Sequence, residues 1–313
     1  METRISTQVD GVTVSLSNLD KPLFSDGFTK GELISYYVEV AEVMLPHLAG
    51  RAVTRVRFPS GTAAQSFYEK NAPAGTPDWV ATMAVATSAG QVSYVLARDR
   101  ATLVWLANLA AVELHTPQWR IEHATIGDFG VILDGAEEPR STTLLIDLDP
   151  GPGVTPEDSA KAAIVAATSL AELGLVAYPK TSGNKGLQLS VPIAPTPASE
   201  VFGFAQALAR SLAARHPRQF VATMAKQARA GLVFLDYAQN LAARNTVTAY
   251  SVRGLASPSV ATPLSWDEVA ALRPDSVLRV SPAEALRRVG TMGDLWEAQI
   301  PTVDSPELPD PPA

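Results

Sequence analysis

Apolar positions recur along the chain with the two spacings that distinguish strands from helices. Residues 12–16 alternate like a short strand. Thr29 and Glu32 have the spacing of a capping box, and an amphipathic stretch follows at 33–48. Further strands are predicted at 51–58, 91–97, 142–149, 175–180, 186–192 and 232–235, and further helices at 101–112, from 156, at 197–215, and after Ser265 and Ser281. Strands and helices do not alternate regularly, so the sequence predicts an α+β fold rather than a doubly wound one.

The apolar strand predicted at 142–149 ends in two acidic residues. Asp147 and Asp149 are two positions apart, so their side chains point to the same side of a strand. Two neighbouring carboxylates repel each other unless a cation lies between them, and a divalent metal ion is the usual cation. The PGPG segment at 150–153 ends the strand and places the pair at a sheet edge or cleft mouth. The spacing alone fits a turn or helix-capping pair equally well.

Asp236 is a third acidic residue in a similar position. It lies in the segment GLVFLDYAQN, at the end of a second short apolar strand. Three carboxylates at one edge could hold one or two Mg²⁺ or Mn²⁺ ions, the arrangement with which polymerases and nucleases carry out phosphoryl transfer. Taken by itself, an aspartate in this position is more often part of a turn.

A glycine-containing loop lies between two predicted strands in the segment YPKTSGNKGLQLSV. Backbone amides at glycines, the Ser182 hydroxyl and the Lys185 ammonium can all bind phosphate oxygens. The spacing is not that of a Walker A loop. Taken by itself, the loop is better explained as a hairpin turn with an exposed lysine, but its place between the two acidic strands favours binding of a triphosphate.

Three further stretches combine basic, aromatic and polar side chains. The first precedes a helix N-terminus, which is a natural anion site. The second places aromatic residues beside a lysine, a combination that can stack bases and hold backbone phosphates. Core packing or solvated surface charge is the commoner explanation for each stretch. The residues concerned are Asn18, Lys21 and Lys30 in the first, Phe67, Tyr68 and Lys70 in the second, and His115 in the third.

Composition narrows the class of protein. The chain has 313 residues, 46% of them apolar, and no apolar run approaches the ~18 residues that span a membrane. The N-terminus lacks the apolar core of a secretion signal, so a soluble cytoplasmic protein is predicted. The absence of cysteine excludes disulfides, thiolate nucleophiles and cysteine zinc sites. A net charge of −7 argues weakly against a nucleic-acid partner, although the acidic, proline-rich tail at 301–313, which is predicted to be disordered, contributes to it.

Eight segments, taken in order, resemble one protein family. They are SNLDKPLF, TKGELISYY, SFYEKNAPAGTPDWV, ELHTPQWR, LLIDLDPG, KTSGNKGLQLSVP, VFLDYAQN and AYSVRG. Together they resemble the polymerase domain of bacterial ATP-dependent DNA ligase D, of the archaeo-eukaryotic primase superfamily, over residues 5–298. The resemblance implies a primase-like core of mixed and antiparallel sheets flanked by helices. It also implies one catalytic domain at 1–300, with a DNA 5′-phosphate pocket in 1–140 and the catalytic residues in 141–300.

The resemblance implies a role for each candidate residue. The catalytic metals, one or two Mn²⁺ or Mg²⁺ ions, would bind Asp147, Asp149 and Asp236. The base of the nucleotide or template would stack on Phe67 and Tyr68, and the 5′-phosphate would bind Asn18, Lys21 and Lys30. The nucleotide would bind Lys70, His115, Ser182, Lys185, Gln188 and Arg253.

The implied activity is that of a primase-polymerase which adds nucleotides, preferably ribonucleotides, to primer 3′ ends at short gaps or broken ends during DNA repair. No ligase or phosphoesterase segment is visible, so a stand-alone, monomeric, nucleoid-associated member is predicted. It would work with a separate ligase and with an end-binding protein.

Two positions depart from the family pattern. The glycine loop usually ends in Gly-Leu-His, whereas here Gln188 replaces the histidine and cannot become cationic. The aromatic pair is Phe-Tyr where Phe-Phe is common, and stacking should survive this change. Two alternatives stay open at this point: a metal-dependent nuclease that uses the same acids, and a weakly active module that binds DNA ends and recruits a ligase.

Overall fold

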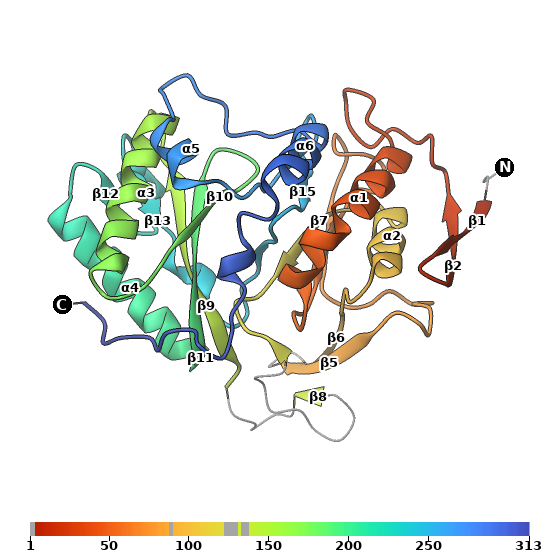
Figure 1. Ribbon diagram of the computed structural model, residues 1–313, viewed down its shortest axis with the longest axis horizontal. Helices are drawn as coiled ribbons and strands as arrows, with labels where there is room; N and C mark the ends of the chain where they lie inside the picture. The colour runs from red at the N-terminus through yellow and green to blue at the C-terminus, as the bar shows by residue number, and fades with distance from the viewer. Residues whose placement is uncertain (1–3, 88–89, 122–130, 133–137, 313) are drawn as a thin grey trace.

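The computed structural model describes residues 4–87, 90–121, 131–132 and 138–312. The chain forms two halves that lie side by side, each with sheet strands and helices of its own (Figure 1). Most strand pairs are antiparallel, and strands do not alternate regularly with helices. The predicted α+β class is therefore confirmed.

The N-terminal half contains a four-stranded sheet, a three-stranded sheet, a hairpin and two helices. Its elements are β1 (Arg4–Val9), β2 (Val12–Ser17), α1 (Lys30–Leu48), β3 (Thr54–Arg57), β4 (Phe67–Glu69), β5 (Thr82–Thr87), β6 (Gly90–Val95), α2 (Arg100–Asn108), β7 (Ala111–Thr116) and β8 (Val131–Ile132). The four-stranded sheet has the order β14-β7-β3-β4, in which β14 (Thr246–Val247) comes from the second half of the chain. Helix α1 begins at the predicted capping box, where Glu32 N–H donates to the side chain of Thr29.

The C-terminal half is built around a five-stranded sheet of order β10-β11-β9-β13-β12. Its elements are β9 (Arg140–Pro150), α3 (Pro156–Ala171), β10 (Tyr178–Thr181), β11 (Leu187–Pro197), α4 (Ala198–Arg215), β12 (Phe220–Val221), η2 (Lys226–Arg229), β13 (Val233–Leu235), η3 (Tyr237–Asn240) and α5 (Trp266–Ala270). The same part of the chain supplies β15 (Val252–Arg253), β16 (Ser259–Val260), α6 (Pro282–Met292) and η4 (Glu297–Gln299), but Val252, Val260 and Ala285 belong to the core of the N-terminal half, where α6 packs against α1. Helices α3 and α4 pack on one face of the sheet, where their apolar side chains form a core with the strands (Figure 1).

The central strand β9 determines where the acidic residues point. Leu144, Ile146 and Leu148 belong to the core formed with α3 and α4. Because successive residues of a strand point to opposite faces, Asp147 and Asp149 project from the other face of the sheet. Strands β11 and β13 pair with β9 on its two sides, and a slip by one residue would exchange the apolar and acidic faces. Packing of the apolar face therefore fixes the position of the carboxylates.

The helix predicted at 101–112 is shorter than expected. It ends at Asn108, and Ala111–Thr116 form strand β7 instead. Ala110 has a left-handed backbone conformation (φ 57°), which ends the helix and directs the chain into the sheet. Pairing of β7 with β3 then overrides the helical preference of this apolar segment.

Residues 301–312, the described part of the tail that the sequence predicts to be disordered, contact the C-terminal half. The backbone N–H of Ala194 in β11 donates to the carbonyl of Pro306 at 2.8 Å. Leu308 packs against the core of the C-terminal half. One apolar side chain and one backbone hydrogen bond thus hold a segment whose composition is typical of disorder.

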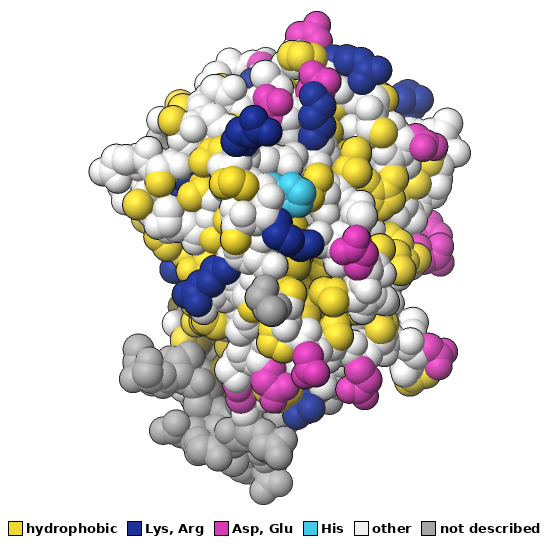
Figure 2. Space-filling view, turned by 90° about the vertical axis from the view of Figure 1, so that its left-hand side faces the viewer, with side chains coloured by type: hydrophobic (Ala, Val, Ile, Leu, Met, Phe, Trp, Pro, Cys, Tyr) yellow, Lys and Arg dark blue, Asp and Glu magenta, His cyan; other side chains and the backbone are white. Residues whose placement is uncertain are grey.

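Charge is distributed unevenly over the surface. Figure 2 shows a row of acidic side chains toward the lower part of this face, Lys and Arg side chains in the centre, and acidic and basic side chains together at the top. The net charge of −7 therefore does not decide whether a particular site binds anions. Among the described residues, no helix combines the length and the apolar character needed to cross a membrane.

Candidate active site

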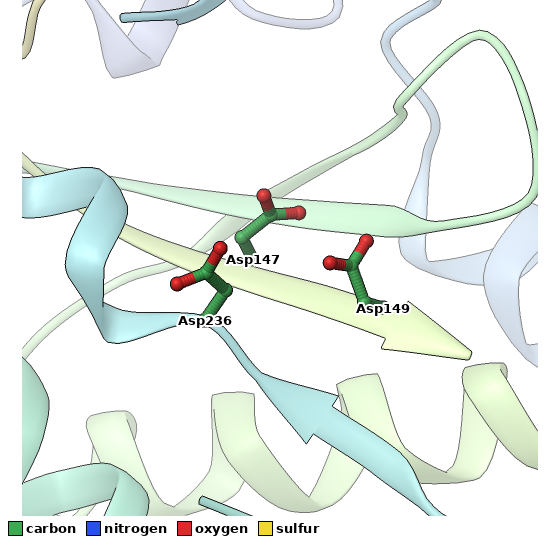
Figure 3. Close-up of side chains that lie close together, drawn as sticks. All are labelled: Asp147, Asp149 and Asp236. Carbon is green, nitrogen blue, oxygen red and sulfur yellow. The ribbon is translucent and has the colours of Figure 1, made fainter. Parts of the chain in front are cut away.

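Three carboxylates converge at the inner face of the five-stranded sheet. Asp147 and Asp149 project from β9, and Asp236 follows β13, the neighbouring strand (Figure 3). Asp236 N–H donates to the carbonyl of Asp147 at 3.0 Å, which continues the pairing of the two strands up to the site. One carboxylate oxygen of each residue lies within 4.8 Å of the others. The structure therefore brings together the three acids that the sequence placed at two strand ends.

Crowding of these carboxylates changes their affinity for protons. Burial and the neighbouring charges of Asp149 and Asp236 raise the pKa of Asp147 to about 8, although a hydrogen bond from Gln188 acts in the opposite direction. Burial and Asp236 also raise the pKa of Asp149, against the influence of Arg229. The site therefore retains a proton near neutral pH unless another cation replaces it. Three carboxylates with oxygen donors in reach of one point suit a hard divalent cation such as Mg²⁺ or Mn²⁺.

Asp236 is held by the turn that follows it. Its Oδ1 accepts a hydrogen bond from Ala238 N–H at 3.2 Å, and its Oδ2 accepts one from Gln239 Nε2 at 2.9 Å. The turn that the sequence allowed as an alternative is thus present, and it orients the carboxylate toward Asp147 rather than competing with a metal site.

The glycine loop lies against the acidic strand. Ser182 N–H donates to Gly186 O at 2.9 Å, and Gly186 N–H donates to Ser182 Oγ at 3.2 Å, so the loop is closed on itself. A Cβ at position 186 would meet the carbonyl of Leu148 at 2.9 Å. Only glycine lets the loop approach β9 this closely. The loop is therefore positioned beside the carboxylates by its backbone.

An open cavity of about 470 Å³ connects these elements. It brings together seven of the residues predicted from the sequence, namely Asp147, Asp149, His115, Ser182, Lys185, Gln188 and Arg253. Five further polar residues that the sequence did not single out line it as well, namely Asn184, Arg229, Gln239, Asn245 and Thr246. A cavity lined by both acidic and basic groups suits a ligand that carries phosphates together with metal ions.

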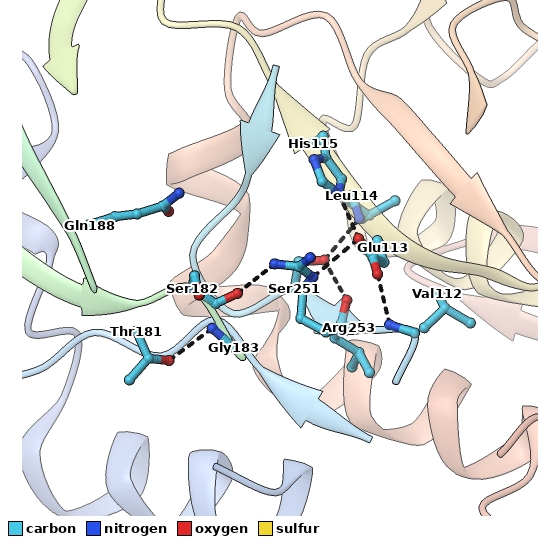
Figure 4. A network of polar contacts seen from close by, with 12 residues as sticks. Val112, Glu113, Leu114, His115, Thr181, Ser182, Gly183, Gln188, Ser251 and Arg253 are labelled. Atoms are coloured by element: carbon cyan, nitrogen blue, oxygen red, sulfur yellow. Dashed lines mark hydrogen bonds and ion pairs between the residues drawn. The ribbon is translucent and has the colours of Figure 1, made fainter. Parts of the chain in front are cut away.

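Glu113 is a central residue of the site that sequence reasoning missed. Its Oε2 lies 2.8 Å from His115 Nε2 and 3.2 Å from Arg253 Nε, and its Oε1 accepts from Gly254 N–H at 2.8 Å (Figure 4). Arg253 Nη1 in turn donates to the carbonyl of Ser182 at 2.6 Å. The available signal was the alternation of β7, which places Glu113 and His115 on one face.

The charge of Glu113 is stabilised by its partners. Burial alone would raise the pKa of this carboxyl, but the hydrogen bond from His115 and the charge of Arg253 outweigh burial and lower the pKa to about 2. A permanently ionised Glu113 therefore orients one residue from β7 and one from β15, both of which line the cavity.

The predicted aromatic pair and Lys70 lie next to this cavity. The Tyr68 ring packs edge-on against His115 with centroids 6.2 Å apart, and its hydroxyl accepts from Asn245 Nδ2 at 3.3 Å. Phe67 is 46% exposed and, as the neighbouring residue of β4, faces the opposite side. Lys70 Nζ donates to the carbonyl of Ala243 at 3.3 Å. Tyr68 is thus the member of the pair that borders the site.

The three residues predicted to bind a 5′-phosphate do not share one environment. Asn18 and Lys21 line an open cavity of about 440 Å³ near the β1–β2 hairpin. Lys21 is exposed, and its Nζ donates to Pro59 O at 2.6 Å. Lys30 is only 4% exposed, and its Nζ donates to Ser17 Oγ and Asn108 O. The structure brings Lys21 to the surface cavity and directs Lys30 into the interior.

The fold and the site define the class of protein. An α+β architecture that places three carboxylates beside a cavity lined by basic side chains is that of a polymerase-type nucleotidyltransferase domain.

The chain belongs to the family described as LigD, primase-polymerase domain, which matches residues 29–296. It is 40% identical over 297 residues to the multifunctional non-homologous end joining protein LigD of Mycolicibacterium smegmatis, covering 93% of this chain and 37% of that protein. It is 33% identical over 263 residues to the bifunctional non-homologous end joining protein LigD of Bacillus subtilis, covering 82% of this chain and 39% of that protein. The chain thus spans less than two fifths of the length of these relatives.

A solved structure is also similar. The polymerase domain of Mycobacterium tuberculosis ligase D, in complex with DNA, superimposes with a TM-score of 0.84 at 38% identity, covering 94% of this chain and 99% of that one. The family inferred from the eight sequence segments is therefore confirmed.

The position of Glu113 generates a prediction about nucleotide affinity. Glu113→Gln removes the negative charge that holds His115 and Arg253, so the KM for the nucleotide should rise about ten-fold, the usual effect of losing a charge-assisted hydrogen bond. Steady-state kinetics with the nucleotide varied would measure it.

Glu69→Gln is the matched control for this variant. Glu69 pairs with Arg55 and Arg57 in the same sheet and does not line the cavity. It should leave the KM unchanged. Equal effects of the two substitutions, or no effect of Glu113→Gln, would show that Glu113 does not orient the nucleotide site.

Proposed function

We propose that this chain catalyses template-directed addition of nucleotides to a primer 3′ end at short gaps or broken ends of DNA. The observation that carries the proposal is the convergence of three carboxylates, within 4.8 Å of one another, beside a cavity that Asp147 and Asp149 line together with Lys185 and Arg253. Its membership of the LigD primase-polymerase family supports the same reaction.

Asp147, Asp149 and Asp236 would hold one or two divalent cations, Mn²⁺ or Mg²⁺. When bound, such ions lower the pKa of the attacking 3′-hydroxyl and neutralise the charge of the leaving pyrophosphate. The chain itself contributes a rigid mount, because β9 is paired on both sides and Asp236 is held by its own turn. The three carboxylates therefore have the fixed geometry that transfer of a phosphoryl group requires.

The triphosphate would lie along the glycine loop. Ser182 and Lys185 line the cavity from this loop, and Arg253 faces them from β15. Arg253 Nη1 donates to the Ser182 carbonyl, so the arginine and the loop are held together and would contact the phosphates from two sides. Gln188 contributes a neutral donor where the family usually has histidine.

The base and sugar would occupy the part of the cavity near β4 and β7. Tyr68 and His115 are in edge-to-face contact there. Phe67 precedes Tyr68 in β4, and Lys70 comes directly after this strand. Aromatic faces stack on any base, so this end supports template-dependent rather than base-specific selection. The proposal includes a preference for ribonucleotides.

DNA would be held at its 5′-phosphate side by Asn18 and Lys21, whose open cavity lies in the N-terminal half. The similar M. tuberculosis domain was solved with DNA, which supports the same partner here.

We propose further that the chain acts as a monomer on gapped or broken DNA in the nucleoid, with nucleoside triphosphates as substrates. A DNA ligase and an end-binding protein would act with it.

Primer extension on a gapped duplex tests the reaction. Asp149→Ala should lower extension by at least about 10³-fold, because metal-bound charge stabilisation contributes several kcal/mol to the transition state. Binding of gapped DNA, measured by fluorescence anisotropy, should stay within about two-fold of wild type, since the substitution removes a negative charge and no DNA contact.

Asp304→Ala, in the exposed C-terminal segment, is the control for this variant and should extend normally. Using end-labelled primer with and without nucleotides separates extension from degradation. Loss of primer length without nucleotides, or full extension by Asp149→Ala, would refute the proposed polymerase.

The 5′-phosphate pocket gives a second prediction. Wild-type protein should bind a gap with a 5′-phosphate more tightly than one with a 5′-hydroxyl. Lys21→Ala should reduce this ratio about ten-fold, because one charge-assisted contact to phosphate is lost. Lys161→Ala, an exposed lysine on α3 in the C-terminal half, should keep the wild-type ratio. An unchanged ratio in Lys21→Ala would place the phosphate elsewhere.

A further inference from the structure

A row of three polar side chains crosses the sheet from the interior to the candidate active site. Lys180, Gln188 and Asp147 stand directly opposite one another on the adjacent strands β10, β11 and β9. Lys180 Nζ donates to Gln188 Oε1 at 2.5 Å, and Gln188 Nε2 donates to Asp147 Oδ1 at 3.1 Å. The glutamine therefore links a lysine in the interior to a carboxylate of the proposed metal site.

Lys180 is an unusual residue to find inside a protein. It is 2% exposed, and its Nζ lies 5.6 Å from the centre of the Trp296 ring. Trp296 is itself fixed by a hydrogen bond from its Nε1 to Pro179 O at 2.8 Å. Burial lowers the pKa of Lys180 to about 7, although the charge of Asp147 acts in the opposite direction. Burying an amine in this way is costly, so its direct contact with an active-site residue calls for a functional explanation.

The two neighbours of Gln188 determine how its carboxamide is turned. In its charged form Lys180 only donates hydrogen bonds, so it selects the carboxamide oxygen. Asp147, once a divalent cation replaces its proton, only accepts them, so it selects the NH₂ group. The NH₂ group has a second N–H, and Gln188 lines the cavity in which the triphosphate would lie. Both ends of the row therefore specify the same orientation, with the donor side toward the site.

We propose that Lys180 is a positioning residue for nucleotide transfer, which holds the Gln188 carboxamide with its NH₂ group toward Asp147 and the nucleotide cavity. The effect on catalysis rests on the polymerase function proposed above, whereas the orientation of Gln188 does not. Without Lys180, the buried carboxamide oxygen would lose its partner, and the side chain would turn away to find another.

A double-mutant cycle tests the catalytic part. Lys180→Met should lower kcat/KM about ten-fold, the effect of losing one charge-assisted hydrogen bond. The same substitution made together with Gln188→His should cost less than about two-fold relative to Gln188→His alone, since an imidazole can carry its own positive charge and needs no oriented amide. A purely structural lysine would cost the same in both backgrounds, and that result would overturn the proposal.

Two controls keep the cycle interpretable. Lys161→Met makes the same chemical change at a side chain that is 60% exposed, and it should leave kcat/KM unchanged. If Lys180→Met does not keep the wild-type circular dichroism spectrum, Lys180→Gln replaces it in the same cycle. Its side chain is neutral and shorter but still polar, and the same non-additivity is expected.

An NMR measurement tests the orientation without relying on activity. With ¹⁵N-labelled glutamine, the Gln188 carboxamide signals are identified by their absence in Gln188→His. Their protons should exchange slowly with solvent in the wild type and at least about ten-fold faster in Lys180→Met, because the side chain is no longer held. Gln118, which is also buried and donates to Thr246 Oγ1, is the internal reference and should not change.

The two arms separate the two proposals. A wild-type protein that does not extend primers would refute the polymerase function and leave the exchange measurement valid. Unchanged exchange of the Gln188 carboxamide in Lys180→Met would overturn the positioning role, whether or not the protein extends primers.

Discussion

The rest of the structure must overcome the repulsion among the carboxylates of Asp147, Asp149 and Asp236. Three acids within 4.8 Å of one another are unfavourable unless a cation or a proton is shared among them. The sheet nevertheless holds them there, since β9 is paired on both sides and its apolar face is buried under α3 and α4. The free energy of packing in the core therefore offsets the repulsion and keeps the three carboxylates together before any ligand binds.

The basic residues around the site are held by different partners. Lys185 and Arg253 line the cavity, where an incoming triphosphate can reach them. Glu113 binds Arg253 and His115, which fixes both side chains. Lys180 remains in the interior and contacts the site through Gln188. Positive charge is therefore available to phosphates while the metal ligands stay free of direct salt bridges with these residues.

Local patterns in the sequence predicted much of this site. Alternation along one strand predicted that Asp147 and Asp149 point the same way, and capping residues predicted where α1 and α3 begin. Features that depend on strand pairing could not be read in this way. Lys180 meets Gln188 only because β10 pairs with β11 in one particular register. Glu113 becomes important only when β15 brings Arg253 beside it.

Other features that local patterns did not reveal have the same physical origin. The apolar run after residue 101 reads as one helix, but pairing with β3 converts its end into a strand. The composition of the tail does not reveal that Leu308 finds a place on the core. Lys30, a candidate phosphate-binding residue in the sequence, lies in the interior, where its ammonium group donates to Ser17 and Asn108. In each case a contact between residues far apart in the chain outweighs the local preference.

The central claim is that the three carboxylates hold a divalent cation, and a titration with Mn²⁺ followed by electron paramagnetic resonance tests it most directly. Because burial and neighbouring acids raise the pKa of Asp147 to about 8, Mn²⁺ must displace a proton below that pH. The affinity of the wild type should therefore rise about ten-fold per pH unit from pH 6 toward 8 and then level off, and Asp147→Asn should weaken binding and remove this dependence. Binding that is independent of pH and unaffected by Asp147→Asn would contradict the account.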